Sequence, residues 1–203
     1  QQRLQRFIAD RTRILTAMSH DLKTPITRMR LRAEMLDDGE IRARFERDLA
    51  EMESMVGETL EFMRDGSASE AVQRVDLMAL FESLQGDFRE MGKPVEIGGR
   101  VALPYPGRPL ALRRCFTNLL ENAVRYGGHA AVGLEESANE VTVRIRDDGP
   151  GIPEHELERA FEPYFRGEAS RSRETGGTGL GLGIARNIAR AHGGDLVLKN
   201  RAG

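Results

Sequence analysis

The chain has 203 residues, of which 39% are hydrophobic and 31% are charged, and its formal net charge is −2. This composition is typical of folded soluble domains, so it excludes an intrinsically disordered chain and argues against a nucleic-acid-binding surface built on bulk positive charge. We find no signal peptide and no apolar run near the roughly 20 residues that a membrane-spanning helix needs. The single cysteine, Cys115, lies in an apolar helical stretch and is predicted to be buried, which fits a reducing compartment.

Residues 1–65 are predicted to form two helices joined by a short turn at "LDDGE" (residues 36–40). Apolar residues recur every three or four positions on both sides of this turn, which indicates one apolar stripe on each helix. A lone hairpin leaves such a seam exposed, so we expect two copies to pair as a homodimer with a four-helix bundle. The stripes comprise Leu4, Ile8, Leu15, Met18, Leu22, Met29, Ala33 and Leu36, and then Ile41, Phe45, Leu49, Met52, Val56 and Leu60 or Met63.

Residues 66–70 are predicted to be a linker, because "RDGSASE" (residues 64–70) is small, polar and without periodicity. Residues 71–203 then change to short strands and helices. "PVEIGGRVAL" predicts a pair of strands, and "HAAVGLEE" and "EVTVRIRDD" predict two more around a polar turn. "RPLALRRCFTNLLENAVRYG" and "GLGIARNIARAHGG" predict helices that proline and glycine delimit. The predicted fold class is therefore α+β, with a helical hairpin followed by a sandwich of one sheet covered by helices.

The first candidate site is His20, which falls on the face of the first helix opposite the apolar stripe. A neutral imidazole there has a free lone pair that suits nucleophilic attack on phosphorus. The adjacent Asp21 is a candidate to fix the tautomer, and Thr24, one turn on, is a candidate to position a water. Pro25 removes the backbone hydrogen bond to Asp21 and predicts a bend just below the histidine. An exposed histidine on a solvated helix, with an incidental proline, explains the same residues.

The second candidate site begins in "NLLENAVRYGG", where Asn118 and Asn122 lie one turn apart on a predicted helix. An amide oxygen such as that of Asn122 suits a hard Mg²⁺ ion, and Arg125 and Tyr126 follow at distances that reach a phosphate and a base. An asparagine on the surface of an ordinary helix is the alternative reading.

Two glycine-rich segments follow. In "DDGPGIP" the glycines let the backbone pass close to a ligand while Asp147 accepts a hydrogen bond. "GGTGLGLGIARNIA" presents backbone amides at a helix N-terminus, which is a cradle for phosphate. Taken singly, the first is also a good turn and the second a flexible loop. Neither matches the P-loop or the Rossmann pattern.

Together, and in this order, the segments resemble the motifs of sensor histidine kinases. "SHDLKTP" resembles the H box, "TNLLENAVRYG" the N box, "DDGPGIP" the first glycine box, "FEPYFRG" the F box and "GGTGLGLGIA" the second glycine box. The stretch "MSHDLKTPITRMRLRAEML" is similar to osmosensor kinases of the EnvZ type. The resemblance covers nearly the whole chain, and it implies a dimerisation and phosphotransfer domain followed by an ATP-binding domain of the GHKL (Bergerat) type.

The resemblance also implies a role for each candidate residue. His20 would accept the phosphoryl group, with Asp21 as its acid–base neighbour and Thr24 orienting water when the domain dephosphorylates its partner. The metal ligand would be Asn122, holding Mg²⁺ for ATP. The remaining nucleotide-binding residues would be Asn118 and Arg125 near the phosphates, Tyr126 near the base, Asp147 at the adenine amino group with Gly149 and Gly151 shaping its pocket, and Gly177, Thr178, Gly179, Leu180 and Gly181 closing over the triphosphate.

Partners and localisation follow from the same resemblance. The phosphoryl acceptor would be a separate response regulator with an OmpR-like receiver domain, and nucleic acid would not be bound. The chain would be the cytoplasmic portion of a bacterial inner-membrane protein, attached to the membrane only through segments before Gln1. "RGEASRSRETGG" would be a mobile lid. One more strand usually follows "LVLKNRAG" in the family, so we expect the last strand of residues 71–203 to be missing.

Two other functions fit part of the sequence. An ATP-gated conformational machine related to Hsp90, gyrase and mismatch-repair ATPases would share the nucleotide fold but lack the H box on a hairpin. A dimeric scaffold that only docks a regulator would not need Asn122, Asp147 and the glycine segment. The preferred hypothesis is an ATP-dependent protein-histidine kinase, in which positioning and charge neutralisation supply most of the catalysis.

Overall fold

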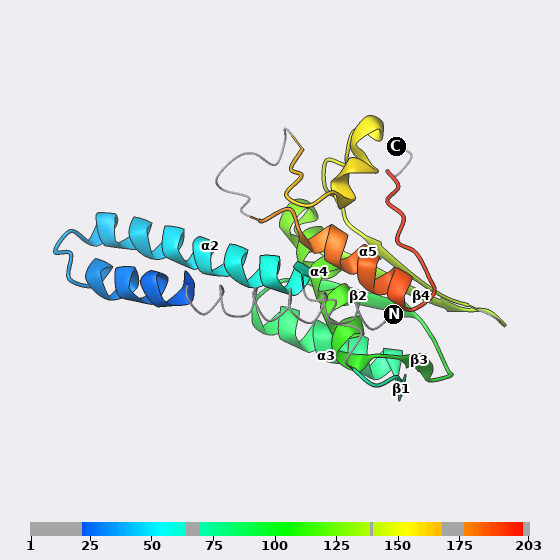
Figure 1. Cartoon of the computed structure of the whole chain (residues 1–203). Helices are drawn as coiled ribbons and strands as arrows, with labels where there is room; N and C mark the ends of the chain where they lie inside the picture. The colour runs from blue at the N-terminus through cyan, green and yellow to red at the C-terminus, as the bar shows by residue number, and fades with distance from the viewer. Residues whose placement is uncertain (1–21, 64–69, 139, 168–176, 201–203) are drawn as a thin grey trace, which may run out of the picture.

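The structure is a computed structural model that describes residues 22–63, 70–138, 140–167 and 177–200. A long helical hairpin extends to one side of a part in which helices pack on a small β-sheet (Figure 1). This α+β arrangement confirms the predicted fold class. No helix among these residues is long and apolar enough to cross a membrane.

The hairpin consists of an N-terminal helix, described over residues 22–33, and α2 (Gly39–Met63). Asp38 begins α2, since its carboxylate oxygen Oδ1 accepts hydrogen bonds from the backbone N–H groups of Glu40 at 2.9 Å and Ile41 at 3.1 Å. These bonds satisfy donors that the first turn of a helix otherwise leaves unpaired. The predicted turn at "LDDGE" therefore ends in an aspartate cap, and Gly39 is the first residue of α2.

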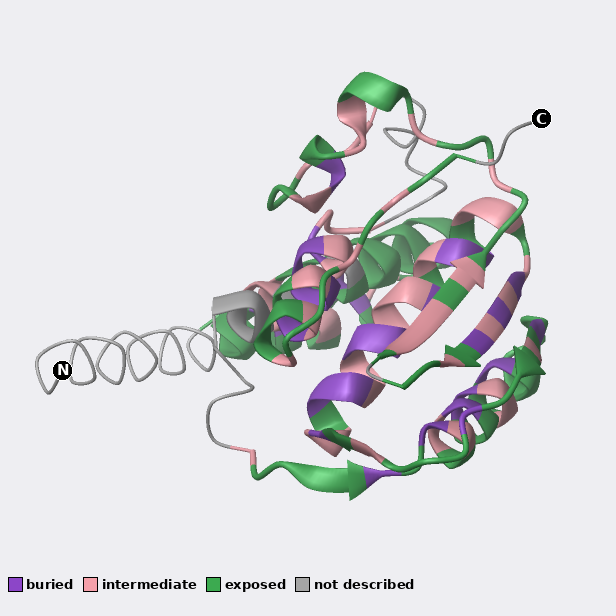
Figure 2. Cartoon of the chain, turned by 90° about the vertical axis from the view of Figure 1, so that its right-hand side faces the viewer, coloured by how far each residue is buried: buried purple, intermediate pink, exposed green. Residues whose placement is uncertain are grey.

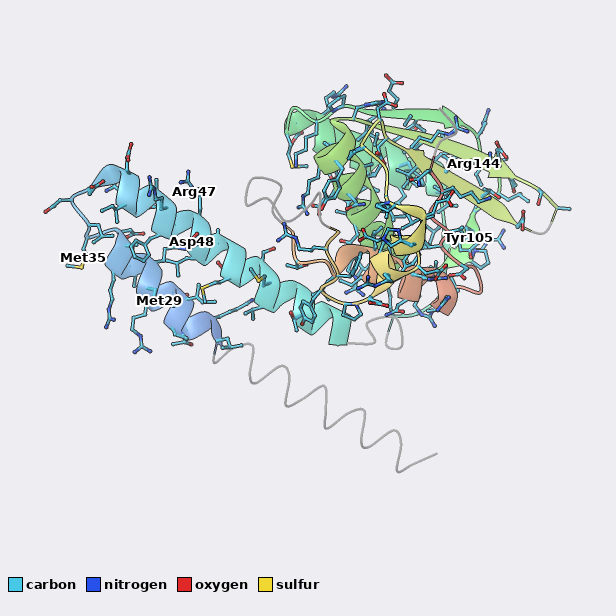
Figure 3. The ribbon with its side chains drawn as sticks, turned by 90° about the horizontal axis from the view of Figure 1, so that it is seen from above. Met29, Met35, Arg47, Asp48, Tyr105 and Arg144 are labelled. Atoms are coloured by element: carbon cyan, nitrogen blue, oxygen red, sulfur yellow. The ribbon has the colours of Figure 1, made fainter. Side chains whose placement is uncertain are left out.

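The hairpin buries only a thin seam. Ile26 and Ala33 pack with Leu49 of α2, and Leu36 and Val56 are partly buried beside them. Ile26, at 3% exposure, is a seam residue that the predicted stripe lacked. Figure 3 labels Met29 and Met35 on this hairpin, away from the α/β part. Several predicted stripe residues remain exposed along the hairpin, namely Leu22, Met29, Ile41, Phe45 and Met52.

The α/β part contains two small sheets and three helices. The elements are β1 (Gln73–Val75), α3 (Leu77–Glu90), β2 (Val95–Gly99), β3 (Tyr105–Gly107), α4 (Pro109–Gly127), β4 (Ala130–Glu136), β5 (Val141–Arg146), the 3₁₀ turns η1 (Glu154–Glu156) and η2 (Arg159–Phe161), and α5 (Gly181–Ala191). Within the described residues, β1 pairs antiparallel with β3, and the other sheet has the order β2-β4-β5. β4 pairs parallel with β2 and antiparallel with β5.

The predicted strand pair in "PVEIGGRVAL" is wrong. Only β2 forms there, and its parallel partner is β4 rather than the residues that follow it. The next residues turn away from the sheet, where Val101 is buried and the backbone N–H of Ala102 donates to the Glu136 carboxylate at 2.7 Å. The other predicted strands and both predicted helices are present, and α4 ends at Gly128 in the left-handed conformation, φ 77°.

The core lies between the helices and one face of the β2-β4-β5 sheet. β4 alternates, with Ala130, Val132 and Leu134 buried, and α3 contributes Phe81, whose ring lies 4.5 Å from that of Phe116 of α4. Figure 2 shows the buried residues gathered where helices and sheet face each other. Cys115 is buried in this core, as predicted, and burial raises its pKa to about 12, so its thiol stays neutral.

Candidate nucleotide-binding site

The amphipathic helix α4 carries the first group of candidate residues. Its apolar face packs into the core, while Asn118, Asn122 and Arg125 follow at helical spacing on another side. Asn118, Asn122 and Tyr126 are half-buried, and Arg125 is exposed. The Asn118 amide nitrogen Nδ2 is buried, and it has no hydrogen-bond partner within the described residues. A buried donor without a partner is costly, so this nitrogen is a candidate contact for a ligand.

The turn after β5 lies directly against the C-terminal end of α4. A Cβ added to Gly127 would lie 2.6 Å from the Asp147 Cβ, so only glycine permits this approach. The Asp147 oxygen Oδ1 accepts a hydrogen bond from the Gly149 N–H at 2.8 Å, which closes the turn on itself. Within the described residues, the other carboxylate oxygen of this exposed side chain makes no hydrogen bond, so it is available to a donor group.

The second glycine-rich segment lies on the other side of α4. A Cβ added to Gly177 would overlap the Arg125 guanidinium, and one added to Gly181 would lie 3.8 Å from the Asn118 Cβ. Thr178 Oγ1 accepts from the Leu180 N–H at 3.3 Å, and Leu180 is fully buried. Gly181 then begins α5, whose first N–H groups have no intrahelical partners.

The F-box segment, residues 161–167, packs against this glycine-rich segment. The Tyr164 N–H donates to the Gly179 carbonyl at 3.1 Å, and a Cβ on Gly179 (φ 73°) would lie 2.7 Å from the Phe165 carbonyl oxygen. Tyr164 itself has φ 63°, a strained value for a residue with a side chain. Its hydroxyl lies 3.2 Å from Thr59 Oγ1 of α2, so this segment also contacts the hairpin.

The structure thus brings together the residues that were predicted for the second site. All of them lie on α4, on the turn after β5 or on the segment that leads into α5. His20 and Asp21 lie outside the described residues, as does most of the predicted lid. Thr24 lies on the exposed surface of the N-terminal helix, which continues through Pro25.

Two family descriptions match the chain. The His Kinase A (phospho-acceptor) domain matches residues 10–68, and the histidine kinase-, DNA gyrase B- and HSP90-like ATPase matches residues 107–203. The sensor histidine kinase GtrS of Pseudomonas aeruginosa PAO1 is 47% identical over 200 residues, which are 98% of this chain and 41% of GtrS. CpxA of Escherichia coli K12 is 31% identical over 94% of this chain and 44% of CpxA.

The chain belongs to the histidine kinase family. It spans about two fifths of the length of the curated relatives it matches. Among solved structures, full-length ShkA in complex with AMPPNP matches 94% of this chain and 43% of its own, with a TM-score of 0.69 and 25% identity. The family match gives the five motifs one common explanation.

The residues of this histidine kinase fit ATP and Mg²⁺. Within the described residues, the partnerless Asn118 Nδ2 is a buried donor on α4, and at Gly177 and Gly181 the backbone passes close to Arg125 and Asn118 with no side chain between them. No group of three His, Cys, Asp or Glu side chains that could hold a metal lies within the described residues. Mg²⁺ usually takes one or two protein oxygens together with phosphate oxygens, and the Asn122 amide is such a donor.

Sequence reasoning missed two residues that shape the histidine kinase site. The Glu70 carboxylate accepts from the N–H groups of Leu110 at 2.8 Å and Ala111 at 3.1 Å, so it caps α4 although it was assigned to the linker. Asn200 binds both polar backbone atoms of Ile152, which lies within the first glycine box. Neither position carries a local signal, because the partners are 40 or more residues away in the chain.

Proposed function

We propose that this chain is the catalytic core of a sensor histidine kinase that moves the γ-phosphoryl group of ATP to His20 and then to an aspartate of a response regulator. The observation that carries the proposal is the convergence of three separate segments around α4, with the buried Asn118 amide facing no protein partner among the described residues. A few polar groups that converge from separate segments are typical of ligand sites.

The proposed nucleotide-binding roles are those that the resemblance implies, and the positions of the residues support them. Asn122 would hold Mg²⁺, and Asn118 and Arg125 would contact the phosphates, beside the glycines that begin α5. Tyr126 would contact the base, and Asp147 would accept from the adenine amino group with the oxygen that Gly149 does not use. The remaining glycine-box residues, namely Gly151, Gly177, Thr178, Gly179, Leu180 and Gly181, would shape the pocket with their backbone.

The hairpin supplies the phosphoryl acceptor. His20 would attack phosphorus with Asp21 as its acid–base neighbour, while Thr24, one turn further on the exposed surface, would orient water in dephosphorylation of the partner. The exposed apolar residues of the hairpin support dimerisation into a four-helix bundle. An OmpR-like regulator as partner, and attachment to a bacterial inner membrane through preceding segments, belong to the same proposal.

The decisive experiment is incubation of the chain with γ-labelled ATP and Mg²⁺. We expect acid-labile label on the protein, and we expect His20→Gln to abolish it while nucleotide binding persists. Asn122→Ala should abolish labelling, because it removes the proposed Mg²⁺ ligand. Release of free phosphate with no label on the protein would instead favour an ATP-gated conformational machine, and absence of ATP binding would favour a scaffold.

Thr24→Ala provides a further test of the hairpin. We expect dephosphorylation of the regulator to fall by roughly tenfold or more, because a positioned general-acid–base or water-orienting group contributes at least that much. Autophosphorylation should change less than about twofold, since Thr24 lies on the hairpin and not on the segments that form the proposed nucleotide site. Thr27→Ala is a suitable control, because the Thr27 hydroxyl donates to the Lys23 carbonyl of its own helix. An equal loss of both activities in Thr24→Ala would contradict the assigned role.

A further inference from the structure

Asn200 makes an unusual two-point contact with the first glycine box. Its side-chain oxygen Oδ1 accepts from the Ile152 N–H at 3.0 Å, and its Nδ2 donates to the Ile152 carbonyl at 2.6 Å. A side-chain amide has the same donor and acceptor as a peptide group, so this pair of bonds imitates one rung of strand pairing. Residues 194–200 form no strand ladder within the described residues, so this side chain takes the place of backbone pairing.

The contact reaches the turn that carries Asp147. Gly151 lies between Asp147 and Ile152 in the chain and has φ 74°. A Cβ added to Gly151 would lie 2.8 Å from Asn200 Oδ1. Asn200 therefore fixes the backbone on the C-terminal side of a turn that the Asp147–Gly149 bond closes on its N-terminal side. The other side packs against α4, where a Cβ added to Gly127 would lie 2.6 Å from the Asp147 Cβ. The exposed turn is thus held from two directions.

The phosphate half of the site does not depend on this contact. Asn118 and Arg125 lie on α4, and Gly177 and Gly181 lie before and at the start of α5, whereas the hydrogen bonds of the Asn200 side chain are to Ile152. A change at Asn200 therefore acts on one end of the pocket only. A positioning role therefore predicts a change in recognition of the base alone, whereas a general contribution to stability predicts weaker binding of every nucleotide.

We propose that Asn200 is a positioning residue for recognition of the adenine ring: by binding both polar backbone atoms of Ile152, it holds the turn so that the Asp147 carboxylate meets the exocyclic amino group. The inference rests on the proposed function, and it assigns base selectivity to a residue outside all five motifs. Loss of Asn200 lets the turn move, so Asp147 loses its fixed position while the phosphate contacts remain.

The experiment compares ADP with IDP, which replaces the amino group of the base by a carbonyl. The unaltered chain should bind ADP more tightly, because the Asp147 carboxylate accepts from an amino group and repels a carbonyl. In Asn200→Ala, titration calorimetry should show ADP affinity weakened by roughly tenfold and IDP affinity by less than about twofold, the effect of losing one or two hydrogen bonds. The preference for ADP should therefore largely disappear.

A second variant replaces only the hydrogen-bond donor of the Asn200 side chain, and it keeps the inference testable if Asn200→Ala does not fold. Asn200→Asp keeps the size and the acceptor for the Ile152 N–H but sets an oxygen against the Ile152 carbonyl, which repels it, so its ADP preference should fall at least as far as in Asn200→Ala. Asn187→Ala is the matched control, because Asn187 is an exposed asparagine of α5. It should leave both affinities unchanged.

The outcomes are distinguishable. If the unaltered chain binds neither nucleotide, the proposed function fails and this inference fails with it. If the unaltered chain prefers ADP and a folded Asn200→Ala protein keeps the same ratio of ADP to IDP affinity, only the inference is overturned. Should Asn200→Ala unfold, the same criterion applies to Asn200→Asp. Parallel weakening of ADP and IDP would also overturn it, because that result indicates a general loss of structure.

Discussion

The two parts of this histidine kinase differ in how completely one chain buries them. In the α/β part, helices and sheet enclose a continuous cluster that includes Phe81, Leu120 and Leu134, each at most 1% exposed. Among the described residues of the hairpin, Ile26, Ala33 and Leu49 are buried, while Phe45 is 51% exposed. Apolar burial drives folding roughly in proportion to area, so the α/β part has its own core and the hairpin lacks one. The exposed apolar residues of the hairpin fit the proposed pairing with a second copy.

The largest expected effect is in the core of the α/β part. Phe81→Ala should lower the free energy of unfolding by about 3–5 kcal/mol, because it leaves a cavity at a fully buried site against Phe116. Denaturant titration measures the change. Leu110→Ala, at a residue that is 73% exposed, is the control and should cost less than about 0.5 kcal/mol. Similar costs at the two positions would show that the α/β core is not the main source of stability.

A smaller effect is expected in the hairpin, and it should depend on protein concentration. Phe45→Glu places a charge on the exposed stripe, so we expect the dimer to dissociate at micromolar concentration without unfolding of the α/β part. Sedimentation equilibrium and the concentration dependence of the melting temperature measure this. Arg47→Ala, at an exposed residue of the same helix that Figure 3 labels, should leave association unchanged. A Phe45→Glu protein that still dimerises would contradict the proposed contrast, in which the hairpin needs a second copy to bury its apolar residues and the α/β part does not.

The α/β part should also show a pH-dependent contribution that the apolar hairpin seam cannot provide. Hydrogen bonds from Arg190 and Arg186 of α5 hold the pKa of Asp195 well below its usual range. A depressed folded-state pKa stabilises the fold above the unfolded value of about 3.9 and loses that stabilisation as the pH falls below it. The difference in unfolding free energy between the unaltered chain and Asp195→Asn should thus be largest at neutral pH and shrink below about pH 4. A difference that is independent of pH would contradict this account.

The smallest effect is expected where the two parts touch. The Thr59 and Tyr164 hydroxyls lie 3.2 Å apart, and Tyr164→Phe removes that hydrogen bond at a cost below about 1 kcal/mol. Hydrogen exchange of the last turns of α2 should become faster. The effects of Tyr164→Phe and Thr59→Val should be less than additive in the double variant, because both remove the same bond, although Thr59→Val also removes the bond from the Thr59 hydroxyl to the Met55 carbonyl at 2.7 Å. Additive effects of the two substitutions would show that the hydroxyls do not interact.

Much of the fold was predictable because its signals are local. The period of α4, its proline start and its glycine end specify a helix, and the alternation in β4 and β5 specifies two strands. The wrong prediction was at "PVEIGGRVAL", where β2 pairs with β4, more than 30 residues away, instead of with the residues after it. Ile26 was missed because both hairpin stripes are apolar and their division between an inner seam and an outer face depends on the second helix.

For the candidate site, the sequence by itself determined which residue types are present and in what order, since asparagine amides, acidic turns and glycine-rich segments are readable wherever they occur. Only the tertiary structure decided that Gly127 admits Asp147, that Arg125 lies beside Gly177, and that Asn200 holds Ile152. The physical reason is the distance along the chain over which each effect acts. Propensity and periodicity act within a few residues, whereas these contacts join segments that meet only when the helices pack on the sheet.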